Sequence, residues 1–334
     1  MKIQHLHSRY DALLAACEPL NPLRTAVVFP CDRLSLEGAL AATRAGLIEP
    51  VLIGAANEIR PLAQQLHWNL EPVEVIDIAD PSAAAAHAVK LARGRQVSAL
   101  MKGSLHTDEL MAQVIRKEDG IRTSRRISHV FVMDVPSYPK LLLITDAAVN
   151  IAPSLEEKAD IAQNAIDLAH ALGVGRPKVA ILSAVETVTA RIPSTIEAAA
   201  LCKMAERHQI TGAILDGPLA LDNAISPESA KVKHIDSPVA GDADILLVPD
   251  MEAGNMLAKE LSYLAGAEAA GIVLGAQVPI VLTSRADSPR ARLVSCAVAV
   301  LYCRPALGQS ISRSAASQSS SPLPTQGTRR KERK

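Results

Sequence analysis

The sequence has few aromatic residues and no net charge. Phenylalanine, tryptophan and tyrosine make up 2% of its 334 residues, and 35 basic residues balance 35 acidic ones. Proteins that bind single-stranded nucleic acid stack bases on aromatic side chains along a basic groove, and anionic membrane surfaces attract a net positive field. The composition therefore argues against nucleic acid and membranes as partners.

Cysteine pairs and long apolar runs are also missing. The five cysteines are scattered, with no CxxC pair and no His/Cys cluster at metal-ligand spacing, so we interpret them as buried thiols in a reducing compartment. Residues 1–14 show no signal-peptide pattern, and the longest apolar stretch, 269–282, is interrupted by two glycines, a glutamine and a proline. We expect a soluble, cytoplasmic protein that binds no metal.

The sequence does contain short β-rich runs that alternate with alanine-rich helical stretches. This alternation predicts an α/β fold, and runs of near-continuous Val, Ile and Leu are typical of buried parallel strands. The predicted strands are 25–29, 50–54, 73–76, 99–102, 129–135, 140–146, 178–183, 212–215, 243–248 and 280–283.

One pair of strands breaks the alternation and suggests the domain organisation. Runs 129–135 and 140–146 are separated by too few residues for a crossover helix, so they predict an antiparallel hairpin. We place a domain change just after this hairpin. The C-terminal end is rich in Ser, Gln, Pro and then Arg and Lys, and such a segment cannot bury enough apolar area to offset its ordering entropy. The predicted parts are a first domain of 1–146 and 279–306, an inserted second domain of 147–278, and a disordered tail of 307–334.

Local capping signals predict where several helices begin. Asp80 precedes a proline suited to a first helical turn, which predicts a helix start there. Ser154 with Glu157, and Ser194 with Glu197, both fit the capping box, in which the two side chains bond free backbone amides. These are structural signals and carry no chemistry.

Polar residues that follow predicted strands are the candidates for ligand binding, because ligands of parallel α/β sheets bind at the carboxyl ends of the strands. One such loop carries Ser104 and Thr107 beside a helix start, where free amides favour an anion. Another carries Ser183 and Thr187, and a third leads to the carboxylate of Asp222. A capped turn or a salt bridge without any ligand is the structural alternative for each.

The end of the last predicted strand brings three reactive side chains together. Ser284 supplies a hydroxyl, Arg285 a guanidinium and Asp287 a carboxylate. A bidentate arginine matches the geometry of phosphate, and a neighbouring hydroxyl can donate to a developing oxyanion. This segment predicts a site for a phosphate-bearing substrate.

Taken together and in this order, six segments resemble the family of phosphate acetyltransferases and phosphate butyryltransferases. The chain is most similar to the butyryltransferase-like branch and to the acyltransferase half of bifunctional enoyl-CoA hydratase/phosphate acetyltransferase proteins, although it has no hydratase half. The segments are 145–150, 182–187, 216–219, 237–241, 252–255 and 284–285.

The resemblance implies a fold, an activity and a set of partners. The fold would be the two-domain α/β fold of isocitrate and isopropylmalate dehydrogenases, with mostly parallel sheets, an interdomain cleft and a homodimer. The activity would be transfer of a short acyl group, acetyl to butyryl, between coenzyme A as co-substrate and inorganic phosphate or acyl phosphate. No metal or bound cofactor is implied, because the thiolate attacks the acyl phosphate directly in a ternary complex and the enzyme supplies positioning and charge stabilisation.

The resemblance also assigns roles to particular residues. Ser284 would stabilise the developing oxyanion or orient the thiol, and Arg285 would hold phosphate. The further residues that it places at the phosphate side or near the cleft are Ser183, Thr187, Asn150 and Asn255.

One departure from the family pattern concerns the general base. The family's acetyltransferases carry a catalytic aspartate seven positions after the serine, where this chain has Ala291. We therefore predict Asp287 as the base, with Asp222 in reserve. The missing aspartate also leaves open a non-catalytic alternative, a regulatory or dimerisation domain that binds acyl-CoA or acyl phosphate. A dehydrogenase of the same fold is disfavoured, since the acidic cluster that would hold its metal is missing.

Overall fold

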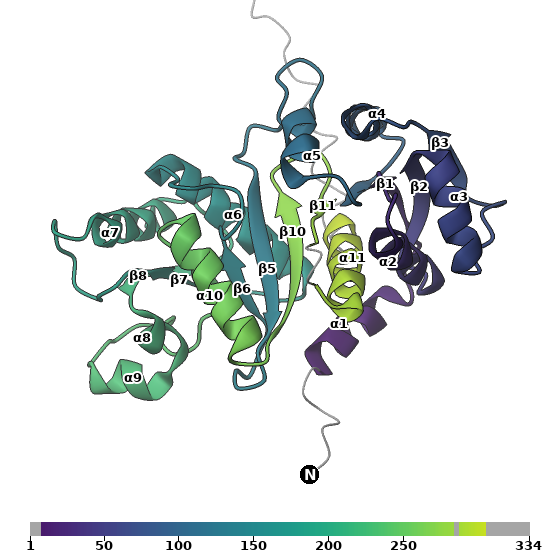
Figure 1. Cartoon of the computed structure of the whole chain (residues 1–334). Coiled ribbons are helices and arrows are strands. Elements are labelled where there is room, and N and C mark those ends of the chain that lie inside the picture. Colours follow the sequence, from purple (N-terminus) through teal and green to yellow (C-terminus); the bar gives the residue numbers. More distant parts are fainter. Residues whose placement is uncertain (1–7, 284–286, 305–334) are drawn as a thin grey trace, which may run out of the picture. The chain divides into compact units, whose positions relative to one another are not determined.

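The computed structural model describes residues 8–283 and 287–304, and Figure 1 shows how its elements are arranged. The strands are β1 (Leu23–Val28), β2 (Ile48–Gly54), β3 (Glu74–Asp77), β4 (Ala99–Lys102), β5 (Ser128–Asp134), β6 (Leu142–Thr145), β7 (Lys178–Leu182), β8 (Ile214–Leu219), β9 (Ile245–Leu247), β10 (Glu268–Leu274) and β11 (Ile280–Val281). The helices are α1 (Ser8–Cys17), α2 (Arg33–Arg44), α3 (Ala56–Gln65), α4 (Pro81–Arg93), α5 (Thr107–Val114), α6 (Leu155–Ala171), α7 (Pro193–Glu206), α8 (Leu221–Ile225), α9 (Pro227–Val232), α10 (Met251–Tyr263) and α11 (Pro289–Cys303).

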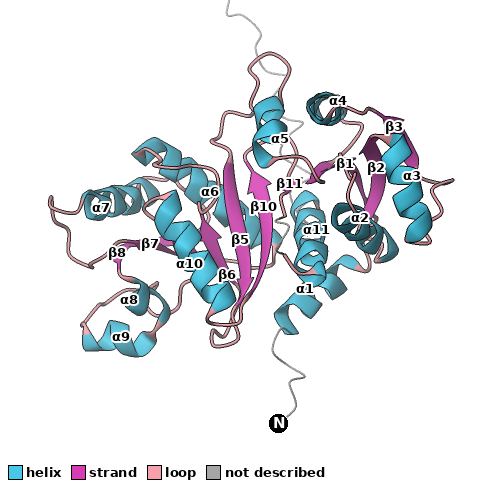
Figure 2. Cartoon of the chain, in the orientation of Figure 1, coloured by secondary structure: helices cyan, strands magenta, loops and turns pink. Residues whose placement is uncertain are grey.

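The strands form one mixed sheet of eleven strands in the order β3-β2-β1-β4-β11-β10-β5-β6-β9-β7-β8. The pairings β5–β6, β5–β10 and β10–β11 at its centre are antiparallel, and the pairings on either side are parallel. Figure 2 shows helices lying beside the strands throughout the chain. The predicted α/β class with a mostly parallel sheet is confirmed, and every predicted strand overlaps an observed one.

The central hairpin is confirmed, but the strand beside it was not predicted. β5 pairs with β6 antiparallel, with Val130 opposite Thr145. β10 pairs with β5 along its whole length, with Gly271 opposite Phe131. Its first residues are Glu, Ala, Ala and Gly, which are all depleted in strands, so the local signal is weak and pairing with two neighbours decides the conformation.

Helix starts with local caps follow the prediction in two of three cases. Asp80 accepts a hydrogen bond from Ala83 N, and Ser154 forms the predicted capping box with Glu157. The capping box predicted at Ser194 is wrong, because the cap of α7 is Ile192, two residues earlier. A proline at the first position of α7 starts the helix without a capping side chain.

Alternate side chains of β5 point to the two faces of the sheet, one packed in the hydrophobic core and the other facing a pocket. Val130 and Val132 are fully buried and belong to the same hydrophobic cluster as Ile272 of β10 and Val294 of α11. Successive side chains of a strand point to opposite faces, so His129 and Phe131 face the other way. These two residues form the floor of a pocket.

The described chain up to Cys303 packs as one compact unit, and strands from both predicted domains join the same sheet. The division into a first and an inserted domain stays a prediction. Within the described ranges, no helix combines the length and the apolar character that crossing a membrane would require.

Candidate active site

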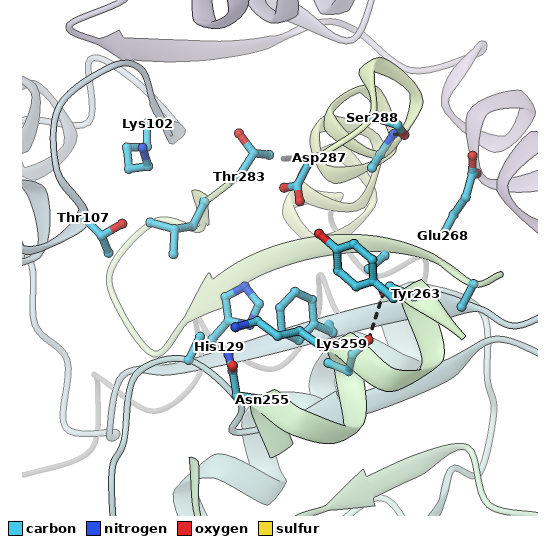
Figure 3. A pocket seen from close by; sticks show the side chains of 18 of the residues that line it. Lys102, Thr107, His129, Asn255, Lys259, Tyr263, Glu268, Thr283, Asp287 and Ser288 are labelled. Atoms are coloured by element: carbon cyan, nitrogen blue, oxygen red, sulfur yellow. Dashed lines mark hydrogen bonds between the residues drawn. The ribbon is translucent and has the colours of Figure 1, made fainter. Parts of the chain in front are cut away.

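A pocket of about 910 Å³ lies over the face of β5 and β10 that carries His129 and Phe131. Figure 3 shows α10 along one side, with the β4–α5 loop and the start of α11 around the rest. Residues of both predicted domains contribute. The lining residues are Lys102, Leu105, His106, Thr107, His129, Phe131, Ala148, Asn255, Ala258, Lys259, Ser262, Tyr263, Ala267, Glu268, Ala269, Leu282, Thr283, Asp287, Ser288 and Ala291.

The β4–α5 loop is pressed against the end of β1. A Cβ at Gly103 would lie 2.4 Å from the Phe29 carbonyl oxygen, so only glycine fits there. The Ser104 hydroxyl donates to the same oxygen over 2.8 Å and accepts from the Cys31 amide over 3.3 Å. Ser104 thus joins two loops, whereas Thr107, at the first position of α5, lines the pocket.

α10 reaches the pocket through a second close approach. A Cβ at Gly254 would lie 2.9 Å from the Ala147 Cβ, so the glycine lets the helix pack against the loop after β6. This places the Asn255 amide nitrogen 3.1 Å from the Ala147 carbonyl oxygen, to which it donates. Asn255 lines the pocket as well, and its role near a substrate cleft stays a prediction.

The segment after the last strand is described only in part. The predicted residues Ser284 and Arg285 lie outside the described residues. Asp287 is half-buried and lines the pocket. Ala291, at the position of the family's aspartate, is buried in the first turn of α11 and lines the same pocket.

Asn150 belongs to a buried polar network outside the pocket-lining set. Its amide nitrogen donates to the Ile127 carbonyl oxygen over 2.9 Å and also to the Asp146 carboxylate. Its amide oxygen accepts from Arg126 Nε over 2.6 Å. The side chain is therefore fully engaged in holding the turn after β6 to the start of β5.

The other predicted residues also make local contacts away from this pocket. The Ser183 hydroxyl lies 2.9 Å from the Ser194 hydroxyl, and Thr187 is exposed. Asp222 lies 3.1 Å from the ammonium of Lys233, and the hydrogen bond from that lysine lowers the pKa of the carboxyl. None of the three is among the described residues that line the pocket, so their ligand-binding roles stay predictions.

His129 is a pocket residue that the sequence did not single out. Its side chain is buried, and its ring packs edge-on against Phe131 with centroids 4.4 Å apart. Nδ1 is buried and has no hydrogen-bond partner in the described part of the chain. Burial lowers the pKa of His129 to about 4, although the carboxylate of Asp146 favours the charged form. The imidazole is therefore neutral near pH 7.

This pKa predicts a loss of stability in mild acid. The pKa of histidine in an unfolded chain is about 6.5, so between that pH and about pH 4 the unfolded state binds a proton that the native state excludes. The free energy of unfolding should fall as the pH drops through this window, by up to about 1.4 kcal/mol per pH unit. Urea unfolding of wild type and His129→Gln at pH 7, 6 and 5 measures this fall in the free energy of unfolding. The exposed His67→Gln is the control. An equal fall in all three proteins would contradict the prediction.

Across 8–283 and 287–304, no three His, Cys, Asp or Glu side chains are grouped so that they could bind a metal ion.

Comparison with known sequences assigns relatives to most of the chain. A family model described as phosphate acetyl/butaryl transferase matches residues 77–300. A phosphate acetyltransferase of Rhizobium meliloti is 62% identical over 295 residues, which are 88% of this chain and 93% of that protein. A phosphate butyryltransferase of Clostridium beijerinckii is 39% identical over 296 residues, 89% of this chain and 98% of that protein.

Solved structures agree with these relatives. A branched-chain phosphotransacylase from Enterococcus faecalis superposes with a TM-score of 0.74 at 31% identity, covering 84% of this chain and 99% of that one. A 4-hydroxythreonine-4-phosphate dehydrogenase from Klebsiella pneumoniae gives a TM-score of 0.52 at 12% identity over 85% of this chain and all of that one. The second likeness shows the fold alone, and it confirms the predicted dehydrogenase-like architecture.

Proposed function

The chain belongs to the phosphate acetyl/butyryltransferase family and is a phosphate acyltransferase, and from this premise we propose that the pocket over β5 and β10 is where it moves a short acyl group between coenzyme A and inorganic phosphate. The observation that carries the proposal is that the pocket lies within the part of the chain that matches the family model. The family match, residues 77–300, contains every residue that lines the pocket. Relatives at up to 62% identity that are named as enzymes also favour catalysis over the regulatory alternative.

The proposed reaction is a direct displacement in a ternary complex. The sulfur of coenzyme A attacks the carbonyl carbon of the acyl phosphate, a C–S bond forms, and the C–O bond to phosphate breaks with release of inorganic phosphate. The thiol proton passes to a base. The reverse reaction forms acyl phosphate from acyl-CoA. No acyl-enzyme is needed, so catalysis comes from holding two substrates together and stabilising the oxyanion.

Asp287 is the proposed base. Its carboxylate lines the pocket directly after the segment that carries Ser284 and Arg285, which we propose as the oxyanion donor and the phosphate ligand. A single preorganised oxyanion donor is worth about 2.7–4 kcal/mol in the transition state. Thr107 and Asn255 are the predicted binding residues that line the same pocket, and they supply polar groups on two further sides.

An assay of thiol release tests the proposal. Acetyl-, propionyl- or butyryl-CoA mixed with the protein should release free coenzyme A only when phosphate is present. The ranking of the three substrates reports the preferred acyl length. No release above background with any of them would remove the proposed function, and calorimetric binding of acyl-CoA without turnover would restore the regulatory alternative.

We also propose that the enzyme acts as a homodimer in the cytoplasm. The family resemblance supports the dimer, and five free thiols support a reducing compartment. A monomer in light scattering would contradict the first point.

A further inference from the structure

Tyr263 is unusual among the aromatic side chains of this protein. The chain has one tryptophan, four tyrosines and two phenylalanines, and all seven lie in the described residues. Six of them are buried or partly buried, whereas Tyr263 is 76% exposed. It lies at the end of α10 and lines the pocket. An exposed aromatic ring beside a pocket offers a flat apolar face to a ligand.

α10 presents a polar stripe to this pocket. The five residues of the helix that line it follow the spacing i, i+3, i+4, i+7 and i+8. In a globular protein this spacing normally marks the apolar stripe that faces the core. Here it is mainly polar. The stripe consists of Asn255, Ala258, Lys259, Ser262 and Tyr263.

Lys259 forms no ion pair with the described residues that would explain its position. The neighbours three and four residues away on the helix are Asn255, Met256, Ser262 and Tyr263, so no carboxylate stands where a helical ion pair would form. Its positive charge thus borders the pocket one helical turn before Tyr263.

The pocket has two ends. Figure 3 shows Lys102 and Thr107 at one side and Tyr263 at the other, with Asp287 between them. Glu268 also lies at the Tyr263 side, but its carboxylate is 3.1 Å from the Arg290 guanidinium, so its negative charge is compensated. Two substrates that meet near Asp287 can therefore extend in opposite directions, and the longer one needs contacts beyond the reacting atoms.

We propose that Lys259 and Tyr263 bind the adenosine bisphosphate end of coenzyme A, the Tyr263 ring stacking on adenine and the Lys259 ammonium pairing with phosphate. This rests on the proposed function, which makes coenzyme A the substrate. Adenine offers an aromatic face for stacking. The phosphate groups on the ribose of the nucleotide are anions that a lysine can hold as a point charge. The two residues lie one turn apart on one face of α10, so they can contact adjacent parts of one ligand.

A truncated substrate separates the nucleotide contacts from the rest. Tyr263→Ala should raise the KM for acetyl-CoA by about tenfold with little change in kcat, because base stacking is lost. The KM for S-acetylpantetheine, which lacks the nucleotide, should not change. Tyr263→Phe keeps the ring and should behave as wild type. Lys259→Gln should raise the KM for acetyl-CoA several-fold, with the difference shrinking as salt screens the charge.

Leu264→Ala is the matched control. Leu264 is the next residue and is 82% exposed, but it is not among the residues that line the pocket. Its replacement should leave both KM values unchanged. Equal losses for acetyl-CoA and S-acetylpantetheine in Tyr263→Ala would place the contact on the pantetheine arm and overturn the proposal. Dissociation of the protein in light scattering by both Tyr263→Ala and Leu264→Ala would assign this surface to a subunit contact and overturn it too.

Calorimetry keeps this test apart from the test of the reaction. Adenosine 3′,5′-bisphosphate should bind the wild-type protein and bind Tyr263→Ala about tenfold more weakly. Absence of binding to the wild type, or equal affinities, would overturn the inference even if acyl transfer proceeds. A wild-type protein that binds this nucleotide but releases no thiol would remove the proposed reaction and leave the nucleotide site standing.

Discussion

Replacing Asp287 by asparagine is expected to lower kcat by about a hundredfold or more and to leave the KM for acyl-CoA nearly unchanged. A carboxylate can accept the thiol proton in the transition state, and an amide of the same size cannot. The half-buried Asp287 lines the pocket, whereas the position of the family's aspartate is occupied by the methyl group of Ala291. Phosphate-dependent thiol release between pH 6 and pH 9 measures the effect.

Three further variants sharpen this assignment. Asp119→Asn removes an exposed carboxylate paired with Arg116 and should keep the wild-type rate. Asp222→Asn tests the reserve base, and a large loss of rate there instead would move the assignment to Asp222. Ala291→Asp, added to Asp287→Asn, returns a carboxylate to the pocket and should recover part of the rate. Full activity of Asp287→Asn across the pH range would show that Asp287 is not the base.

Replacing Arg9 by alanine is expected to lower the free energy of unfolding by about 3 kcal/mol. The Arg9 guanidinium joins α1 to the end of β5. It donates to the Asp134 carboxylate over 2.7 Å and to the carbonyl oxygens of Val135 and Tyr138, each also over 2.7 Å. The Asp134 side chain is 0% exposed, so the alanine variant would leave a buried carboxylate without its cation. Urea unfolding followed by circular dichroism measures the change.

Arg33→Ala is the control for this prediction. Arg33 forms an exposed ion pair with Glu37 one turn along α2, and such pairs contribute less than about 1 kcal/mol. Arg33 lacks both the buried partner and the two contacts to backbone carbonyl oxygens that Arg9 makes. Equal losses of stability in the two variants would contradict the argument that burial of Asp134 makes the Arg9 contact important.

Local signals in the sequence predicted local structure well. The hairpin of β5 and β6 follows from a connection too short for a helix, and the start of α4 follows from Asp80 and the proline after it. Both depend on neighbours in the chain. β10 was missed because its alanines and glycine carry little strand preference, and only the partners on its two sides make it a strand.

For the candidate site, too, local signals in the sequence indicated some features and not others. Thr107 and Asp287 were predicted from their places after strands, and Asn255 was predicted from the family resemblance; all three line the pocket. Ser104 was also predicted from its place after a strand, but its hydroxyl joins two loops. A strand end indicates where a polar side chain lies, but not whether a neighbouring backbone group has already bonded it.

By itself, the sequence determined the α/β class, most of the strands and the kind of chemistry, because these depend on residue periodicity, on caps and on short motifs. Only the tertiary structure decided which polar groups share one cavity. His129 lies in an apolar run, and Tyr263 ends an ordinary helix, so neither has a local signal. They become pocket residues because β10 pairs with β5 and α10 packs against β6 and β10. The β5–β10 and β6–α10 contacts join segments about a hundred residues or more apart in the chain.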